Sequence, residues 1–333
     1  MPPTGPFLKR HTLIGQQIDR IRGLLNTIIG ANPFNTQKLE TADMSYKIRD
    51  LTEFADLAPY TTLQEITDDQ RANPPYGTNL TFLLPRYIRC HHEAGAGARF
   101  RWLDTEESWD TMLLHWAEVF QTAGVTLDDG VFFAPSMQPA LDGWLALESA
   151  ARLGCLCLPG TGLDDRACVQ MMAELGATVL CCSAGDAARL AELAAQEKLE
   201  AVAATVRLVL LGARGAGTAP AERESLARLW PNARVCEHWT LTEAGVVAFE
   251  CPARLGVWHI FEDAILPEVL DPATRQAVEP GQSGELVLTT FFRTGSPLLR
   301  YRTGCLVKTA ADSPCECGRY ELALEGGILG RVG

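Results

Sequence analysis

The stretch Val206-Arg207-Leu208-Val209-Leu210-Leu211 decides the fold class of this chain of 333 residues. It is a short apolar run typical of a buried strand, and similar runs lie at 131–133, 155–158, 178–182 and 234–238. Helical patterns separate these runs, at 141–153, 166–175, 186–195 and 219–229. Because strand and helix alternate in this way, the sequence predicts an α/β fold, a parallel sheet with helices on both faces.

Different patterns flank this α/β region on both sides. Before it, residues 18–29, 51–59 and 61–71 have short helical patterns, and after residue 244 the apolar runs are typical of strands. These strand candidates are 246–250, 258–261, 268–270, 285–290, 298–301 and 306–309. We therefore expect a mostly helical segment 1–85, an α/β subdomain 86–245 and a smaller antiparallel β-rich subdomain 246–333.

The charge balance and the cysteines restrict the class of protein. The net charge is −12, with 29 Lys and Arg against 41 Asp and Glu, which argues against nonspecific binding to nucleic acid or to an anionic membrane. No run approaches the roughly 18 apolar residues of a membrane span, and the N-terminus has the pattern of a helix rather than of a signal peptide. The odd count of 11 cysteines is typical of reduced, mostly buried thiols, so we expect a cytoplasmic protein.

Five motifs follow one another in the second half of the chain. They are Trp239-Thr240-Leu241-Thr242-Glu243, Phe249-Glu250-Cys251, His259-Ile260-Phe261-Glu262-Asp263, Arg300-Tyr301-Arg302-Thr303-Gly304-Cys305 and Pro314-Cys315-Glu316-Cys317-Gly318-Arg319. With these motifs the chain resembles the phenylacetate–CoA ligase family of the adenylate-forming ligases. The resemblance implies the large N-terminal domain of such a ligase. Because the chain ends soon after Arg331, the family's C-terminal lid domain with its catalytic Lys is expected to be absent.

The resemblance implies an acid–thiol ligase that uses ATP, Mg²⁺ and coenzyme A. Members of the family convert an aryl or acyl carboxylate and ATP into an acyl-adenylate, and then pass the acyl group to coenzyme A. Since a carboxylate is a poor electrophile, the enzyme must hold two anions together and stabilise the charge that builds at the α-phosphate. By their position in the family's pocket, Phe133, Ser136, Met137 and Trp144 are candidates to contact the acyl group.

The family's phosphate loop corresponds to His91-His92-Glu93-Ala94-Gly95-Ala96-Gly97-Ala98-Arg99. By resemblance, the backbone N–H groups of Gly95 and Gly97 would bind phosphate, and Arg99 stands where the family has Lys. The hydroxyl residues of the family loop are missing here, and Glu93 adds a negative charge where polyphosphate would lie. The alternative interpretation is a surface turn without a ligand.

The resemblance also assigns residues to the adenine and the α-phosphate. Trp239 would pack on the adenine, with Gly212 and Ala213 lining its pocket. Thr242 would contact the α-phosphate and Glu243 would help to hold Mg²⁺, so these two are the candidate catalytic residues. The alternative is a corner between a strand and a loop that only the fold requires.

At the ribose, Cys305 takes the place of a family Asp, and Arg331 matches a family Arg that contacts ribose and phosphate at the hinge. A thiol is a weak hydrogen-bond partner for the ribose hydroxyls, whereas an ionised carboxylate accepts from both of them. A buried hydroxyl without a partner costs about 1–3 kcal/mol, so we expect nucleotide affinity to fall by tenfold or more.

Three cysteines and one histidine form a separate candidate metal site, made of Cys251, His259, Cys315 and Cys317. Three thiols and an imidazole are a closed donor set for structural, tetrahedral Zn²⁺. In the family branch that the chain resembles, matching residues form a zinc site. The alternative is a group of free cysteines.

Three functional hypotheses remain open at this point. The first is an AMP-forming aryl- or acyl-CoA ligase, completed by a separately encoded C-terminal domain. The second is a pseudoenzyme that binds a nucleotide, a carboxylate or a protein partner without catalysis. The third is a truncated gene product without a present role. The altered phosphate loop and Cys305 favour the second hypothesis, whereas the order of the motifs favours the first.

Overall fold

The computed structural model describes residues 7–95, 98–137, 139–199, 201–213, 217–311 and 313–332, which form two compact units. The α/β unit comprises Met112–Leu241 and Gly245–Trp258. The β-rich unit comprises the described residues of Pro6–Thr111, Thr242–Ala244 and His259–Gly333. These bounds differ from the expected divisions at 85 and 245. The first division differs because residues 87–105 associate with the N-terminal helices. Gln70 joins the two segments through hydrogen bonds to the backbone N–H and C=O of Arg101, at 2.9 and 2.7 Å.

The α/β unit contains the predicted parallel sheet, with its strands in the order β4-β3-β5-β6-β7-β8. Their bounds are β3 (Gly130–Phe133), β4 (Leu156–Pro159), β5 (Val179–Cys182), β6 (Leu208–Ala213), β7 (Arg234–Leu241) and β8 (Gly245–Glu250). Strands β3 to β7 run parallel, and β8 is antiparallel to β7. The stretch 206–211 therefore contributes a central strand, as predicted.

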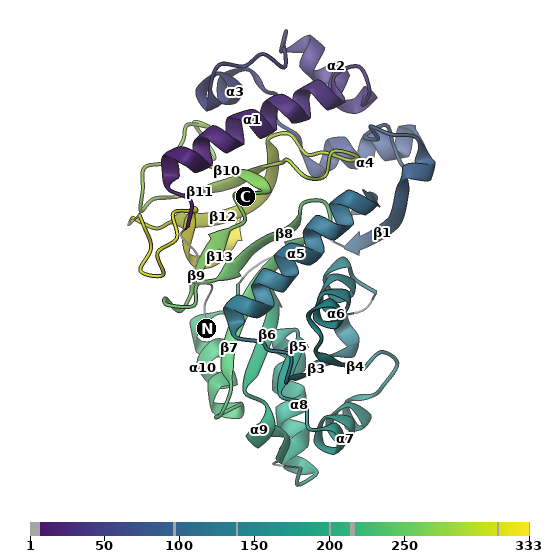
Figure 1. Cartoon of the computed structure of the whole chain (residues 1–333), viewed down its shortest axis with the longest axis vertical. Helices are drawn as coiled ribbons and strands as arrows, with labels where there is room; N and C mark the ends of the chain where they lie inside the picture. Colours follow the sequence, from purple (N-terminus) through teal and green to yellow (C-terminus); the bar gives the residue numbers. More distant parts are fainter. Residues whose placement is uncertain are drawn as a thin grey trace. The chain divides into compact units, whose positions relative to one another are not determined.

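Helices cover both faces of this sheet, as predicted (Figure 1). They are α5 (Glu106–Ala123), α6 (Leu141–Leu153), α7 (Asp165–Leu175), α8 (Ala184–Gln196), α9 (Ala201–Thr205) and α10 (Pro220–Leu229), with a 3₁₀ turn at Pro135–Met137. The helices α7 to α10 pack against one face, in a core that includes Phe132, Leu180 and Val209. On the other face, Trp116 of α5 contacts His238 of β7, with ring centroids 4.4 Å apart.

Antiparallel strands and short helices make up the β-rich unit. The helices are α1 (Arg10–Ile28), α2 (Pro33–Thr41), α3 (Leu51–Leu57) and α4 (Leu63–Ala72), with a 3₁₀ turn at Leu84–Arg86. The strands are β1 (Tyr87–Gly95), β2 (Ala98–Thr105), β9 (Val257–Ile260), β10 (Ile265–Leu270), β11 (Ser283–Thr290), β12 (Tyr301–Thr309) and β13 (Ala323–Arg331). The strands β10-β11-β12-β13 form an antiparallel sheet, and β1 and β2 form a separate hairpin. Ile21 and Leu25 of α1 share a core with Leu266 of β10.

Within the described residues, this unit contains strands that the sequence did not predict, and one expected strand is not formed in full. The described residues of the predicted phosphate loop, 91–95 and 98–99, lie in the strands β1 and β2 of the hairpin, whose mixed polar sequence hid its strand character. The expected strand 306–309 is confirmed as part of β12, which begins at Tyr301 and has a positive φ at Gly304, whereas residues 298–300 of the expected strand 298–301 are not in a strand. The strand β13 was not predicted, because its glycines weaken the strand pattern and pairing with β12 stabilises it.

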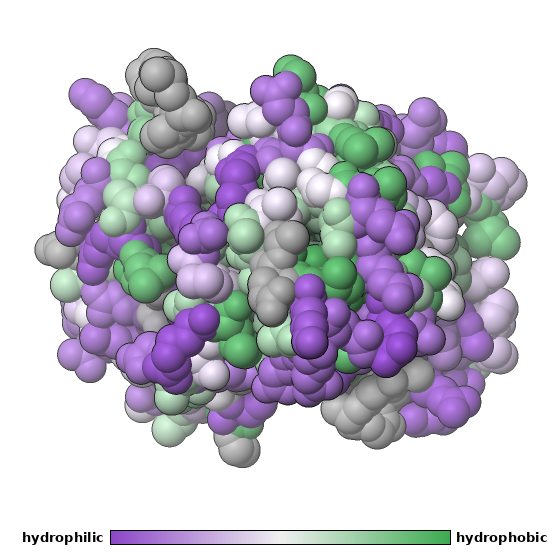
Figure 2. Space-filling view, turned by 90° about the horizontal axis from the view of Figure 1, so that it is seen from below, coloured by the Kyte–Doolittle hydropathy of each residue, from purple (hydrophilic) through white to green (hydrophobic). Residues whose placement is uncertain are grey.

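Among the described residues, no helix is long and apolar enough to cross a membrane. On the face of the molecule shown in Figure 2, hydrophobic residues form small groups between hydrophilic ones. Scattered apolar residues of this kind are normal on protein surfaces.

Candidate functional site

The segment Thr242–Ala244 carries the two predicted catalytic residues and belongs to the β-rich unit. A buried ion pair fixes its backbone, since Arg293 Nη1 donates to the carbonyl oxygen of Thr242 at 2.8 Å. Arg293 also forms two hydrogen bonds with Asp104, Nε to Oδ1 at 2.8 Å and Nη2 to Oδ2 at 2.5 Å. Both side chains are almost fully buried. With its other two nitrogens bound to Asp104, the guanidinium of Arg293 uses Nη1 to hold the backbone of Thr242 in place.

Glu243 is a buried carboxylate with one clear partner. The hydroxyl of Tyr301 donates to Glu243 Oε1 at 2.8 Å. Burial raises the pKa of Glu243, and the negative charge of Glu93 also raises it, whereas the hydrogen bond from Tyr301 and the charge of Arg293 lower it. A carboxylate in such an environment gains from a nearby cation, because the cation offsets the cost of burying its charge.

The hairpin β1–β2 brings one residue of the predicted phosphate loop to this segment. The hydroxyl of Thr242 donates to Glu93 Oε2 at 2.8 Å. Gly95 ends β1, Arg99 lies in β2 with an exposed side chain, and Gly97 lies outside the described residues. The Thr242 hydroxyl, which was predicted to contact a phosphate oxygen, is therefore bound to a carboxylate oxygen of the chain itself.

The predicted ribose residues lie opposite each other on β12 and β13. Cys305 pairs with Arg331 in the sheet register. The backbone oxygen of Thr303 accepts from Arg331 Nη1 at 2.9 Å and from the Cys305 thiol at 3.7 Å. Burial raises the pKa of Cys305, whereas the nearby charge of Arg331 lowers it. At this position the chain therefore presents a buried thiol beside an exposed arginine.

The predicted adenine residues lie in the α/β unit, at the ends of β6 and β7. Ala213 pairs with Trp239 in the register of these strands. Trp239 is fully buried, and its ring centroid lies 6.4 Å from that of Trp258. A Cβ atom added at Gly212 would approach Asp142 Oδ2 to 2.9 Å, so this position tolerates little more than glycine. Arg214, next to this pair, lies outside the described residues.

Sequence reasoning missed two pairs of side chains near these positions. The first is Asp104 with Arg293. In the sequence Arg293 directly follows two phenylalanines, which indicates that it is buried, and a buried arginine requires a carboxylate partner. The second is Asp142 with His238, joined through His238 Nε2 and Asp142 Oδ2 at 2.9 Å. These partners are 96 residues apart, so no local pattern reveals them.

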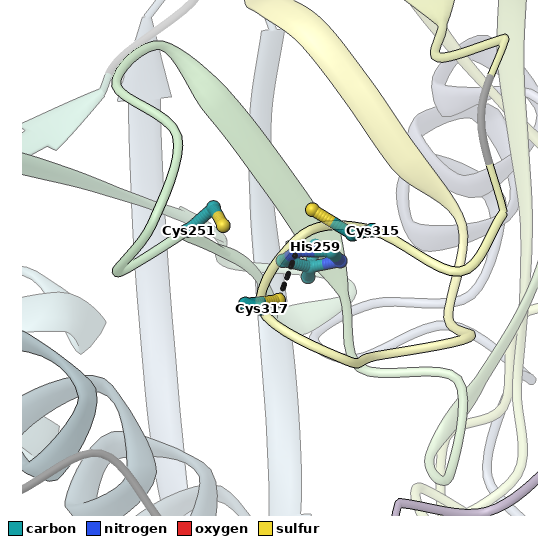
Figure 3. A group of neighbouring side chains, drawn as sticks. All are labelled: Cys251, His259, Cys315 and Cys317. Atoms are coloured by element: carbon teal, nitrogen blue, oxygen red, sulfur yellow. Dashed lines mark hydrogen bonds between the residues drawn. The ribbon is translucent and has the colours of Figure 1, made fainter.

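The four candidate metal ligands lie together, with their ligand atoms within 4.8 Å of one another (Figure 3). His259 lies on β9, and Cys315 and Cys317 lie in a tight turn where Gly318 N–H donates to the Cys315 carbonyl at 2.7 Å. Cys251 follows β8, and its N–H donates to the carbonyl of Val257 at 2.7 Å. Cys317 Sγ lies 3.3 Å from His259 Nε2. Three sulfur donors and one imidazole nitrogen in such a compact group fit tetrahedral Zn²⁺.

Comparison with known proteins finds relatives of similar sequence. No protein-family model matches the chain. The phenylacetate-coenzyme A ligase of Pseudomonas putida is 27% identical over 297 residues, which cover 88% of this chain and 65% of that protein. The enzyme of the same name from Escherichia coli is 25% identical over 298 residues, covering 88% of this chain and 66% of that protein. This chain therefore spans about two thirds of the length of these relatives.

Solved structures agree with the fold. An acyl-CoA ligase solved in complex with 2-HIB-AMP and CoA, 2-hydroxyisobutyryl-CoA ligase, superposes with a TM-score of 0.91 at 21% identity, over 100% of this chain and 72% of that one. Its open conformation gives a TM-score of 0.90. The chain thus shares the fold of these acyl-CoA ligases. The relatives it matches in sequence are phenylacetate–CoA ligases, and a shorter match of 86 residues to the enzyme of Thermus thermophilus reaches 43% identity.

Proposed function

We propose that this chain acts as an AMP-forming acyl-CoA ligase with a weakened nucleotide site. In the first reaction, an oxygen of a carboxylic acid attacks the α-phosphorus of ATP, and pyrophosphate leaves to give the acyl-adenylate. In the second reaction, the thiol of coenzyme A displaces AMP and forms the thioester. The acyl-AMP and CoA in the solved 2-hydroxyisobutyryl-CoA ligase support this pair of reactions.

The arrangement of Thr242 and Glu243 carries the proposal. Arg293 holds the Thr242 backbone, so the Thr242 hydroxyl has a fixed place from which to donate to an α-phosphate oxygen. Glu243, held by Tyr301, would bind Mg²⁺, which neutralises phosphate charge when bound. Arg331 would contact the nucleotide on the other side of this site, next to Cys305. A buried carboxylate and a half-buried hydroxyl, each held in place by neighbouring residues, provide the fixed positions that transfer of the adenylyl group requires.

The test combines binding with turnover. Calorimetric titration of the full chain with Mg·ATP and AMP, and ATP–pyrophosphate exchange with phenylacetate and other carboxylic acids, should both give signals. Glu243→Gln should abolish acid-dependent exchange, whereas Glu192→Gln, an exposed change on α8, should leave it unchanged. No nucleotide binding at millimolar concentration would contradict the proposal.

A second candidate function is nucleotide or carboxylate binding without catalysis. It is favoured by the hydrogen bond between Glu93 and Thr242, which occupies the catalytic hydroxyl, and by the thiol at position 305. Nucleotide binding without acid-dependent exchange, in the presence of each acid tested, would favour this second candidate over the first.

We also propose that Cys251, His259, Cys315 and Cys317 hold a structural Zn²⁺ ion. The support is the closed donor set and its burial, since only Cys317 is partly exposed. A zinc ion bound by four protein ligands has no coordination position left for water, so it would stabilise the fold and would not activate water. His259 and the three thiolates would bind the ion directly, so its role would be separate from the ligase reaction.

A further inference from the structure

A cavity lies within the β-rich unit. Its volume is about 900 Å³, which is at the upper end of the usual range for small-molecule sites, about 300–1,000 Å³. None of Thr242, Glu243, Cys305 and Arg331 contributes to its wall. The residues named for the nucleotide site therefore do not form this cavity.

Much of the cavity wall is apolar. The apolar side chains come from α3, from β10, from the segment that follows β10 and from the segment that leads into β13. They are Leu51, Ala55, Pro267, Val269, Leu270, Ala277, Val278, Pro280, Leu322 and Ala323. A wall of this kind favours a ligand with a substantial apolar body.

Three arginines line the cavity, and two of them are already paired. Arg300 forms hydrogen bonds with both carboxylate oxygens of Glu268, at 2.8 and 3.0 Å. Arg10 donates to both carboxylate oxygens of Glu262, at 2.6 and 2.8 Å. These two guanidinium groups are therefore neutralised within the protein.

Arg275 is the arginine that remains available. Within the described part of the chain it has no carboxylate partner, and its guanidinium lies 5.7 Å from the ring centre of Tyr60. Its backbone has φ +62°, a left-handed conformation that glycine adopts with less strain. The turn around Asp271 enforces this conformation, because Arg275 N–H donates to the Asp271 carbonyl at 2.8 Å and Asp271 N–H donates to that of Gln276 at 2.8 Å.

The wall of the cavity also contains the hydroxyl of Tyr60, whose ring lies near this cation. The Tyr60 oxygen accepts from Arg300 Nη2 at 2.9 Å, and for the Tyr60 proton the described residues provide no acceptor. The guanidinium of Arg275 and the hydroxyl of Tyr60 can thus both donate hydrogen bonds, and a carboxylate can accept from both groups.

The acidic groups on the wall restrict the charge of the ligand. Glu321 accepts from Arg319 at 3.1 Å, while Asp56 on α3 is exposed. With Arg10, Arg300 and Glu321 each paired, the remaining charges on the wall are one cation, Arg275, and one exposed acid, Asp56. A phosphate or diphosphate would carry more negative charge than this single cation can match, whereas one carboxylate at Arg275 is matched.

We infer that this cavity binds a monocarboxylic acid with a long apolar body, its carboxylate held by Arg275 and Tyr60 and its apolar body held by the wall formed by α3 and β10. The site is independent of the proposed ligase reaction, because it shares no residue with the nucleotide site.

The test uses decanoate and decan-1-ol, which have the same chain length and differ in charge. Calorimetric titration of the full chain should show decanoate binding, weakened about tenfold or more in Arg275→Gln, with the affinity for decan-1-ol unchanged in that variant. Ala277→Trp, at an exposed position of the wall, should fill the cavity and weaken both ligands. Arg228→Gln, an exposed change on α10, should bind both ligands as the unaltered chain does.

Two results would overturn the inference. One is the absence of decanoate binding to the unaltered chain at about 1 mM, a concentration that detects even weak sites. The other is decanoate binding that neither Arg275→Gln nor Ala277→Trp changes, which would place the ligand elsewhere, for example in the acyl pocket of the ligase site. Thermal unfolding of both variants is the control that they remain folded.

Discussion

Position 305 is where a single side chain most affects the proposed nucleotide site. The Cys305 thiol lies next to Arg331 in the sheet, and burial keeps it protonated. A carboxylate here would have a cationic neighbour and would accept hydrogen bonds from ribose hydroxyls.

We expect Cys305→Asp to tighten AMP binding by about tenfold, which corresponds to about 1.4 kcal/mol. The measurement is calorimetric titration with AMP, and Cys305→Asn is the matched control, because it has the same shape without the charge. Equal affinities for the Asp and Asn variants would show that no ribose contact is made at this position.

Glu93 affects the same site through its charge and its hydrogen bond. Its carboxylate accepts from the Thr242 hydroxyl and also raises the pKa of Glu243, to which burial makes the largest contribution. We expect Glu93→Gln to tighten Mg·ATP binding by about threefold to tenfold, since the change removes a negative charge near the phosphates.

The control for this change is Glu106→Gln, at the exposed start of α5. The affinity gain of Glu93→Gln should shrink at high salt, because it comes from an exposed charge. A Kd that stays the same as that of the unaltered chain would contradict a role for Glu93 at the nucleotide site.

At the scale of elements, the hairpin β1–β2 depends on the ion pair between Asp104 and Arg293. Removing one partner leaves the other buried and unpaired, so Arg293→Met should lower the free energy of unfolding by about 3 kcal/mol or more. Urea unfolding measures this change. The double variant Asp104→Leu with Arg293→Met should recover part of the loss, because no charge then remains unpaired.

If the ion pair of Asp104 and Arg293 were only structural, removing it would change the free energy of unfolding and leave the activity unchanged. Since Arg293 also holds the carbonyl of Thr242, we expect the double variant to lose acid-dependent ATP–pyrophosphate exchange even where its stability recovers. Full exchange activity in a stable double variant would show that Thr242 does not need this support.

The same hairpin contains a buried histidine. Burial lowers the pKa of His91 to about 4, although nearby Asp104 acts in the opposite direction. His91 stacks on Trp109, with ring centroids 5.6 Å apart. The folded chain therefore holds His91 neutral, whereas the unfolded chain takes up a proton below its usual pKa of about 6.5.

This difference in the pKa of His91 between the folded and unfolded chain determines how the free energy of unfolding changes with pH. Between about pH 6.5 and 4 the unfolded state binds more protons, so His91 lowers the free energy of unfolding progressively as the pH falls, by about 3 kcal/mol in total. The variant His91→Phe should lack this part of the pH dependence, whereas the exposed change His92→Gln should keep it. Parallel curves for the unaltered chain and His91→Phe would contradict the prediction.

At the scale of the whole molecule, the proposed zinc ion joins segments that are far apart in the chain. His259 and Cys317 lie 58 residues apart and come within 3.3 Å. An ion that closes such a long loop stabilises the folded state over the unfolded one.

The prediction is that the purified, untagged chain contains about one Zn²⁺ per molecule and that chelation lowers its melting temperature. Cys317→Ala should reduce the zinc content, while Cys90→Ala, a change at an exposed cysteine, should not. Zinc should also be lost on acidification, because thiolates and imidazole must release the ion to bind protons. Less than about 0.3 zinc per chain would favour free cysteines.

The sequence by itself determined the features that depend on local pattern. Apolar runs such as 206–211, separated by amphipathic helices, were enough for the parallel sheet, because the period of hydrophobic residues is set by neighbours along the chain. The ordered motifs were likewise enough to predict the resemblance to phenylacetate–CoA ligases, which are the relatives found by comparison. The chemistry of Cys251, His259, Cys315 and Cys317 also suggested a metal site before their proximity was known.

Only the tertiary structure decided which distant residues meet. The strand β13 exists because β12 offers it a partner, and the loop expected at 91–99 became a hairpin because its two halves pair with each other. Asp104 and Arg293 are 189 residues apart, and neither has a local pattern that names the other. Contacts of this kind depend on the burial of charge and on backbone pairing across the fold, which the linear order of the residues does not record.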